Sequence, residues 1–174
     1  MLPRNGRIYL VPLDEFPVDR AQALAAHFRA TFDVPIDVAS PMAWPDGAHD
    51  DRRGQMDTSV MLSHLEAAFP EGHPRAVAIG LSMRDLFNPE VGWNYVFSYR
   101  RNNRVAVVSP VRMDRGCMGV MPADEARVLS RLKKMVGKNI GIMYFGLDLS
   151  PDPGSMLYRN IGGPQELDAM SERF

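Results

Sequence analysis

The sequence predicts a single domain of the mixed α/β class, and three observations lead to this prediction. Short apolar runs typical of strands alternate with segments of helical spacing. One run, at 76–81 (AVAIGL), is continuously apolar, which is typical of a central strand covered on both faces. The 174 residues suffice for one substantial core, and no repeat, low-complexity segment or long linker divides them.

The first part of the chain is predicted to form two strands around a helix. Residues 7–13 (RIYLVPL) are rich in β-branched and aromatic residues, as short buried strands are. Apolar residues recur at helical spacing over 18–32, and Pro17 stands at the helix start, where its missing N–H is tolerated. Residues 34–38 (VPIDV) alternate as a second strand, and a polar loop follows over 40–55.

The middle of the chain is predicted to add a helix, the central strand and a hairpin. Asp57 or Thr58 is suited to cap a helix whose apolar residues continue to Ala68. After the central strand, residues 85–89 (DLFNP) are expected to form a turn. The hairpin strands are 96–100 and 104–111, joined by a tight turn whose asparagines tolerate positive φ.

The last part is predicted to contain one long helix followed by loops. Helical spacing runs from Ala123 to about Phe145, and beyond Gly146 the chain is rich in proline and glycine. A short terminal helix is expected from Gln165. We therefore expect an upper α/β part over 1–146 and a small, loop-rich C-terminal subdomain over 147–174.

The bulk composition is that of an ordinary globular protein, with 45% hydrophobic residues, 24% charged residues and a formal net charge of −1. This balance predicts no direct nucleic-acid binding and no membrane partner. No run is apolar enough for a membrane span, and the N-terminus lacks the apolar core of a secretory signal. Cys117 is the only cysteine, so an intrachain disulfide is impossible. A cytoplasmic location is the resulting expectation.

Common catalytic motifs are missing from the sequence. It contains no G-x-S-x-G elbow, phosphate-binding loop or dinucleotide fingerprint. The four histidines (His27, His49, His64 and His73) lack the spacing of zinc ligands on one helix, and we interpret them as surface or singly bonded residues. Cys117 is interpreted as a packed or idle thiol rather than a nucleophile.

Basic residues gather in three small clusters. They are Arg52-Arg53, Arg100-Arg101-Arg104 and Lys133-Lys134-Lys138. We interpret each cluster as a solvated face, with a contact surface for an acidic partner as the alternative.

The order of several segments resembles the archaemetzincins, a family of small zinc peptidases. The resemblance runs through RIYLVPL, VPIDVASP and DDRRGQMDTSVMLSHL, and continues through AVAIGLSMRDLFNPEVGWNYVFSYRR and RVAVVSPVRM. Its most specific parts are RGQ at 53–55 and DLF at 85–87. It covers nearly the whole chain and implies a metzincin-like (zincin-like) domain with a twisted mixed sheet and a long former active-site helix.

The family's zinc motif, H-E-x-x-H-x-x-G-x-x-H, is replaced here by NIGIMYFGLDL. Gly146, Leu147, Pro151 and Pro153 match family residues and fix the register. In that register, the three histidine positions hold Asn139, Met143 and Leu149, the general-base position holds Ile140, and the two early cysteine positions hold Ser150 and Ser155.

These replacements predict that the protein binds no metal, needs no cofactor and has no catalytic residue. Zinc requires imidazole, thiolate or carboxylate donors, and isoleucine cannot take a proton from water. We further expect Ile140, Met143 and Leu149 to converge as one buried apolar cluster where the family holds its zinc. Asn139, the remaining polar residue, then needs a hydrogen-bond partner or contact with water.

The resemblance implies a non-catalytic role through protein–protein contacts. The nearest precedent is the CarG-type regulator of myxobacteria, an archaemetzincin-like protein without peptidase activity that works with the transcription factor CarD. One alternative is a peptide or small-molecule binder that uses the vestigial substrate cleft. If the protein binds a peptide, we expect the peptide to add as a further strand to the edge of the sheet. We predict that this edge strand consists of Arg104, Val105, Ala106, Val107 and Val108. The other alternative is an enzyme with metal-free chemistry, for which Asp148 is the nearest candidate acid.

Overall fold

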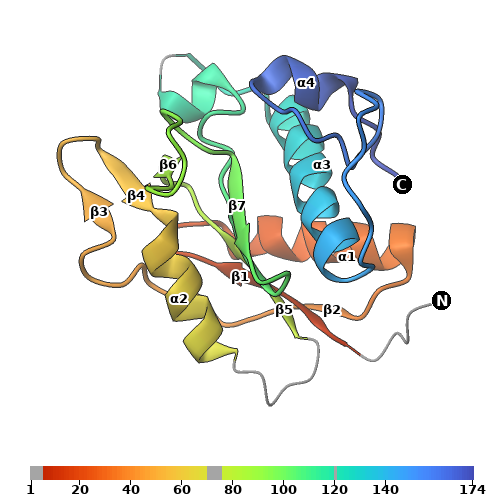
Figure 1. Ribbon diagram of the computed structural model, residues 1–174, viewed down its shortest axis with the longest axis horizontal. Helices are drawn as coiled ribbons and strands as arrows, with labels where there is room; N and C mark the ends of the chain where they lie inside the picture. The colour runs from red at the N-terminus through yellow and green to blue at the C-terminus, as the bar shows by residue number, and fades with distance from the viewer. Residues whose placement is uncertain (1–5, 70–75, 120) are drawn as a thin grey trace.

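A five-stranded sheet crosses the centre of the molecule in the order β2-β1-β5-β8-β7 (Figure 1). The computed structural model describes residues 6–69, 76–119 and 121–174. The strands of this sheet are β1 (Ile8–Pro12), β2 (Ile36–Val38), β5 (Val77–Leu81), β7 (Ser98–Arg101) and β8 (Val105–Val108). Four of them run parallel, and β7 runs antiparallel to β8.

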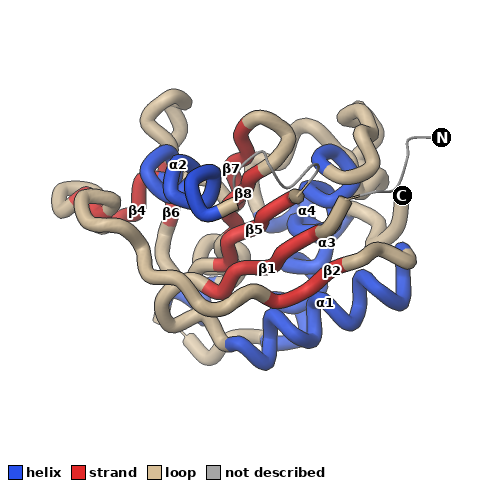
Figure 2. The backbone as a smooth tube through the Cα atoms, turned by 90° about the horizontal axis from the view of Figure 1, so that it is seen from below, coloured by secondary structure: helices blue, strands red, loops and turns tan. Residues whose placement is uncertain are grey.

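Helices cover both faces of this sheet, and each face has its own core. On one face lie α1 (Val18–Phe32) and α3 (Glu125–Met143), packed on strand residues such as Ile79 and Ala106. On the other lies α2 (Thr58–Ala68), packed on Ala78 and Val105 (Figure 2). Because successive strand residues point to opposite faces, the covered strand β5 is apolar throughout. The predicted mixed α/β fold is confirmed.

Most of the predicted elements are present, whereas three very short strands were missed. These are β3 (His49–Asp50), β4 (Gln55–Asp57) and β6 (Leu86–Phe87), which form a second sheet in the order β3-β4-β6. The sequence assigned them to a loop and a turn, because two or three residues are too few to display a period. The short 3₁₀ helix η1 (Arg115–Met118) also lies in a segment expected to be a loop.

The assignment of the edge strand was wrong. Strand β8 lies inside the sheet, because it pairs with β5 on one side and with β7 on the other. The residues proposed as an open edge, from Arg104 to Val108, therefore offer no free strand edge to a peptide. A hairpin pattern gives the antiparallel pairing of its two strands but not which of them joins the larger sheet. The open edge on this side is β7.

The segment after α3 folds back along that helix and ends in α4 (Pro164–Ala169). Two glycines of α3 allow the close approach. A Cβ atom on Gly137 would lie 2.7 Å from the Met156 Sδ atom, and one on Gly141 would lie 2.5 Å from the Phe174 ring. Within the described ranges, no helix combines the length and apolarity required to cross a membrane.

Candidate functional site

A cleft of about 790 Å³ opens between β7 and α3. One wall is the segment 92–100, which includes most of β7, and another is formed by Met135 and Lys138 of α3. Leu149 and the segment 159–162 complete it. Figure 1 shows β7 running alongside α3, with the C-terminal segment passing over and beside α3. The cleft is therefore bounded by the open sheet edge and by the helix that resembles the family's active-site helix.

The alternation of side chains along β7 separates its residues into two groups. Ser98 lies on the α3 side, because its Oγ accepts a hydrogen bond of 2.9 Å from the Asn139 side chain. Arg100, two residues on, shares that face of the strand. Arg101 lies on the α2 side, where its guanidinium donates to the Ser63 Oγ at 2.9 Å. The cleft thus receives a hydroxyl and a guanidinium from β7.

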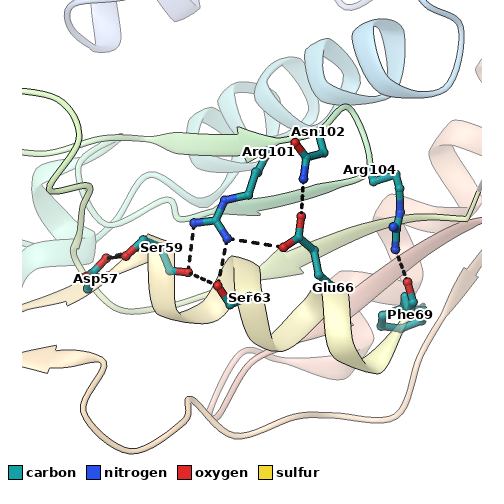
Figure 3. A network of polar contacts seen from close by, with 8 residues as sticks. All are labelled: Asp57, Ser59, Ser63, Glu66, Phe69, Arg101, Asn102 and Arg104. Atoms are coloured by element: carbon teal, nitrogen blue, oxygen red, sulfur yellow. Dashed lines mark hydrogen bonds and ion pairs between the residues drawn. The ribbon is translucent and has the colours of Figure 1, made fainter. Parts of the chain in front are cut away.

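The far end of β7 is fastened to α2 (Figure 3). Glu66 accepts hydrogen bonds from Arg101, at 3.4 Å, and from Asn102, at 2.8 Å. Arg104 donates to the Phe69 carbonyl oxygen. The tight turn between the strands places Asn102 and Asn103 at positive φ, as the sequence predicted. These contacts fix the edge strand independently of any ligand in the cleft.

Lys138 is a buried cation in the wall of the cleft. It is 7% exposed, and its Nζ donates to the Tyr158 carbonyl oxygen. Burial, together with the nearby positive charge of Arg100, lowers the pKa of Lys138 to about 8. An ammonium with this pKa is still mostly protonated at pH 7.

Arg100 is a second cation of the cleft, in the wall formed by β7. Burial lowers its pKa, yet an arginine side chain stays charged at any physiological pH. Among the residues that the structure describes, it has no hydrogen-bond or ion-pair partner. No described residue that lines the cleft is acidic, and Asp148 is exposed outside it. The cleft is therefore positively charged and rich in hydrogen-bond donors.

Aromatic residues also line the cleft. The Tyr95 hydroxyl lies 3.3 Å from the Gly162 carbonyl oxygen, which joins the segment before β7 to the C-terminal segment. The Arg112 guanidinium stacks over the Tyr95 ring at 4.9 Å and forms an ion pair with Asp85 at 2.6 Å. Trp93, also in the lining, is 65% exposed at the rim.

The structure confirms only part of the predicted apolar cluster. Ile140 and Met143 are buried in the core beside α1, at 0% and 8% exposure. Leu149 is 43% exposed and lines the cleft, so its predicted place in the cluster was wrong. Gly146 turns the chain at a φ of 68°, and the Leu147 N–H donates to the Gly141 carbonyl oxygen. This turn leads the following residues past the helix end towards the cleft rather than into the core.

Asn139 is 1% exposed, and its amide group is only partly satisfied. Its Nδ2 donates to the Ser98 Oγ and, at 3.0 Å, to the Met135 carbonyl oxygen. Its Oδ1 finds no hydrogen-bond partner among the described residues. The predicted need for a partner is thus met on the donor side alone.

The residues at the aligned ligand positions do not fit a zinc ion. The Asn139 amide group points its N–H donors at Ser98 and Met135, the Met143 thioether is part of the core, and Leu149 offers no donor atom. The Ser150 and Ser155 hydroxyls accept hydrogen bonds from backbone N–H groups at 3.1 Å, which stabilises turns in the loop. Across 6–69, 76–119 and 121–174, no three His, Cys, Asp or Glu residues are grouped to hold a metal.

The described histidines (His27, His49 and His64) and Cys117 are not part of the cleft lining. His49 contacts Asp51 at 2.9 Å, His64 is exposed on α2, and His73 lies outside the described residues. His27, on α1, has a pKa lowered mainly by burial. Burial also raises the pKa of the half-buried Cys117 thiol, which disfavours the reactive thiolate.

Two cations of the cleft were misread from the sequence. Arg100 and Lys138 belong to clusters interpreted as solvated faces, yet both line the cleft, one from β7 and the other from α3. The strand alternation of SYRR was a usable signal for Arg100, because it separates this residue from Arg101. No local signal distinguishes Lys138 from Lys133, since both depend on how α3 is oriented.

The sequence matches no protein-family model, and no curated protein matches it. Solved structures do match. A zinc-dependent peptidase from Methanocorpusculum labreanum aligns with a TM-score of 0.81 at 23% identity, over 96% of this chain and 95% of that one. Archaemetzincin from Archaeoglobus fulgidus, complexed with malonate, aligns with a TM-score of 0.76 at 22% identity, over 97% and 94%. Archaemetzincin from Methanopyrus kandleri aligns with a TM-score of 0.75 at 24% identity, over 100% and 92%. The chain has the archaemetzincin fold.

Proposed function

We propose that this protein is a non-catalytic protein of archaemetzincin fold that binds an extended segment of a partner protein in the cleft beside β7. The observation that carries the proposal is the open sheet edge, which forms one wall of a cleft of about 790 Å³.

The lack of catalysis follows from the residues at the aligned positions. Ile140 cannot act as a general base, and Asn139, Met143 and Leu149 supply no suitable donor set for zinc. No described residue in the cleft lining offers a carboxylate as a replacement base.

Segment binding is supported by the backbone of β7. The Ser109 N–H donates to the Phe97 carbonyl oxygen at 2.9 Å, so the backbone groups of Phe97 point towards β8. In an antiparallel pair this direction alternates, so the backbone groups of Ser98 and Arg100 point to the open side. An extended segment can add there as a further strand, because this mode of binding needs only backbone hydrogen bonds.

Two experiments test the proposal. First, the purified protein, with zinc added, is incubated with casein and with peptide libraries, and no cleavage is expected. Second, the tightest-binding peptide from such a library is remade with one N-methyl group at each position in turn. N-methylation should abolish binding at every second residue, because only alternate backbone groups face β7. Cleavage would contradict the non-catalytic role, and equal tolerance of N-methylation at all positions would contradict strand addition.

The proposed partner is a transcription factor of the CarD type. This choice rests on the resemblance to CarG-type regulators, which act without peptidase activity. Co-purification of the tagged protein from the organism that makes it, with identification of the bound proteins, tests the choice. A CarD-like protein should be enriched over a control with Arg100→Gln, and its absence from the bound fraction would contradict this partner.

A further inference from the structure

Three hydrogen-bond donors of β7 and α3 line the cleft, whose described lining also includes Arg159 and contains no acidic residue. The Arg100 guanidinium has no hydrogen-bond or ion-pair partner among the described residues. The Lys138 Nζ donates one hydrogen bond to a described residue, to the Tyr158 carbonyl oxygen. An ammonium has three N–H donors and a guanidinium has five, so Lys138 and Arg100 both retain donors that no described residue uses. The third group is the Ser98 hydroxyl.

The hydrogen-bond direction at Ser98 is fixed by Asn139. Because the Asn139 Nδ2 donates to the Ser98 Oγ, the hydroxyl acts there as an acceptor. The Ser98 O–H donates to no hydrogen-bond acceptor within the part of the chain that the structure describes. Asn139 thus orients Ser98 as a donor towards the cleft that Ser98 lines.

We propose that Ser98, Arg100 and Lys138 form a carboxylate-binding site, at which the bound segment places an aspartate or glutamate side chain or its own C-terminal carboxylate. The inference rests on the proposed function, and it names the chemistry that the bound segment must carry. A carboxylate offers two coplanar oxygens that match the fork of an arginine, and it can accept further bonds from an ammonium and a hydroxyl.

Burial strengthens this site. Lys138 is 7% exposed, and a partly desolvated charge pair is weakened less by water and salt than an exposed pair. A bound anion would also restore the pKa of Lys138 towards its ordinary value, because a neighbouring negative charge stabilises the ammonium. Binding should therefore take up protons near pH 8, which calorimetry in buffers of different ionisation enthalpy detects.

The test uses one hexapeptide library in two forms, with a free C-terminal carboxylate and with a C-terminal amide. Retained peptides are identified by mass spectrometry after gel filtration with the full-length protein. Affinities are then measured from the tryptophan fluorescence, to which Trp93 at the cleft rim contributes together with the buried Trp44. The variants are Arg100→Gln, Lys138→Met and, as a matched control, Arg101→Gln, which removes the same charge one residue away on the opposite face of β7. Thermal unfolding of each variant checks that it is folded.

We expect one of two patterns among the retained peptides. Either Asp and Glu are enriched at one position in both forms of the library, or peptides with a free C-terminal carboxylate are retained and their amides are not. The first pattern identifies a side-chain carboxylate and the second a chain terminus. Arg100→Gln and Lys138→Met should each weaken binding by about 10- to 100-fold, the range for the loss of one charge-assisted hydrogen bond. Arg101→Gln should change it less than threefold.

Different results separate the two proposals. If neutral peptides bind as well as acidic ones and the two cleft variants bind them like the parent, the carboxylate site is refuted while segment binding stands. If no peptide is retained in either form, segment binding is refuted. Succinate is then titrated alone into the parent protein and into Arg100→Gln. Quenching of the tryptophan fluorescence in the parent protein but not in the variant would support the carboxylate site. No quenching in the parent protein would refute it.

Discussion

Replacement of Lys138 by methionine should stabilise the fold near neutral pH. Lys138 is 7% exposed, and burial with a smaller effect of Arg100 lowers its pKa from 10.5 to about 8. A pKa that is lower in the folded state means that folding weakens proton binding. Between the two pKa values the unfolded chain holds the extra proton, so the stability of the parent protein rises with pH across this window. At pH 7 the charged Lys138 costs about 3 kcal/mol of folding free energy.

Methionine has a similar length and helix propensity and carries no charge. The substitution also removes the hydrogen bond to the Tyr158 carbonyl oxygen, which is worth about 1 kcal/mol. The net expectation at pH 7 is therefore a gain of about 2 kcal/mol in the free energy of unfolding.

Urea denaturation of parent and variant at pH 7, 8, 9 and 10 measures this effect. Other titrating groups are common to both proteins and cancel in the difference. Between pH 7 and 10 the difference should shift by about 2.5 kcal/mol in favour of the parent protein, so that the advantage of Lys138→Met is lost by pH 10. Lys133→Met, at a half-buried position of the same helix, is the control and should not produce a comparable gain in stability at pH 7. A variant that is less stable at pH 7, or an advantage that does not vary with pH, would refute the reasoning.

Three further predictions concern the core, metal and the β7–β8 turn. Met143→Ala should lower the free energy of unfolding by about 2–5 kcal/mol because it opens a cavity, whereas Leu149→Ala, at the cleft rim, should change it by at most about 0.5 kcal/mol. Equal losses in denaturation curves would contradict the difference in burial. EDTA should leave the thermal midpoint unchanged, and a clear fall in calorimetry would reveal a metal site that contributes to folding. Glu66→Gln should weaken the contacts of the turn with α2 and speed amide hydrogen exchange over residues 101–104. Glu125→Gln, which removes only the ion pair with Arg20, is its control, and equal exchange in both variants would contradict the role of Glu66.

The fold was largely predictable because its main elements have readable periods. The 3.6-residue spacing over 18–32 and 123–145 gave α1 and α3, and the continuous apolar run at 76–81 gave the central strand β5. The asparagine turn gave the β7–β8 hairpin, because two positive φ angles favour asparagine. The second sheet was missed, since strands of two and three residues are specified by tertiary pairing and leave no pattern in the sequence.

The sequence could address the residue types at the site but not how they are arranged. The residues at 139, 140, 143 and 149 can be judged against zinc chemistry from the sequence, because donor atoms are a property of residue type. The positive cleft depends instead on cations that lie far apart in the chain: Arg100 and Lys138 are separated by 38 positions, and Arg159 also lines the cleft. Arg100 and Lys138 face each other only because β7 lies beside α3.

The sequence by itself determined the mixed α/β class, the order of the long elements and the residue types at the positions aligned with the zinc ligands, because periodicity and donor chemistry are local properties. Only the tertiary structure decided which strand is the open edge, which cations are buried and where Leu149 points. Those features depend on which elements become neighbours: β8 is enclosed because β5 and β7 pair with it, and Leu149 lines the cleft because Gly146 turns the chain towards β7.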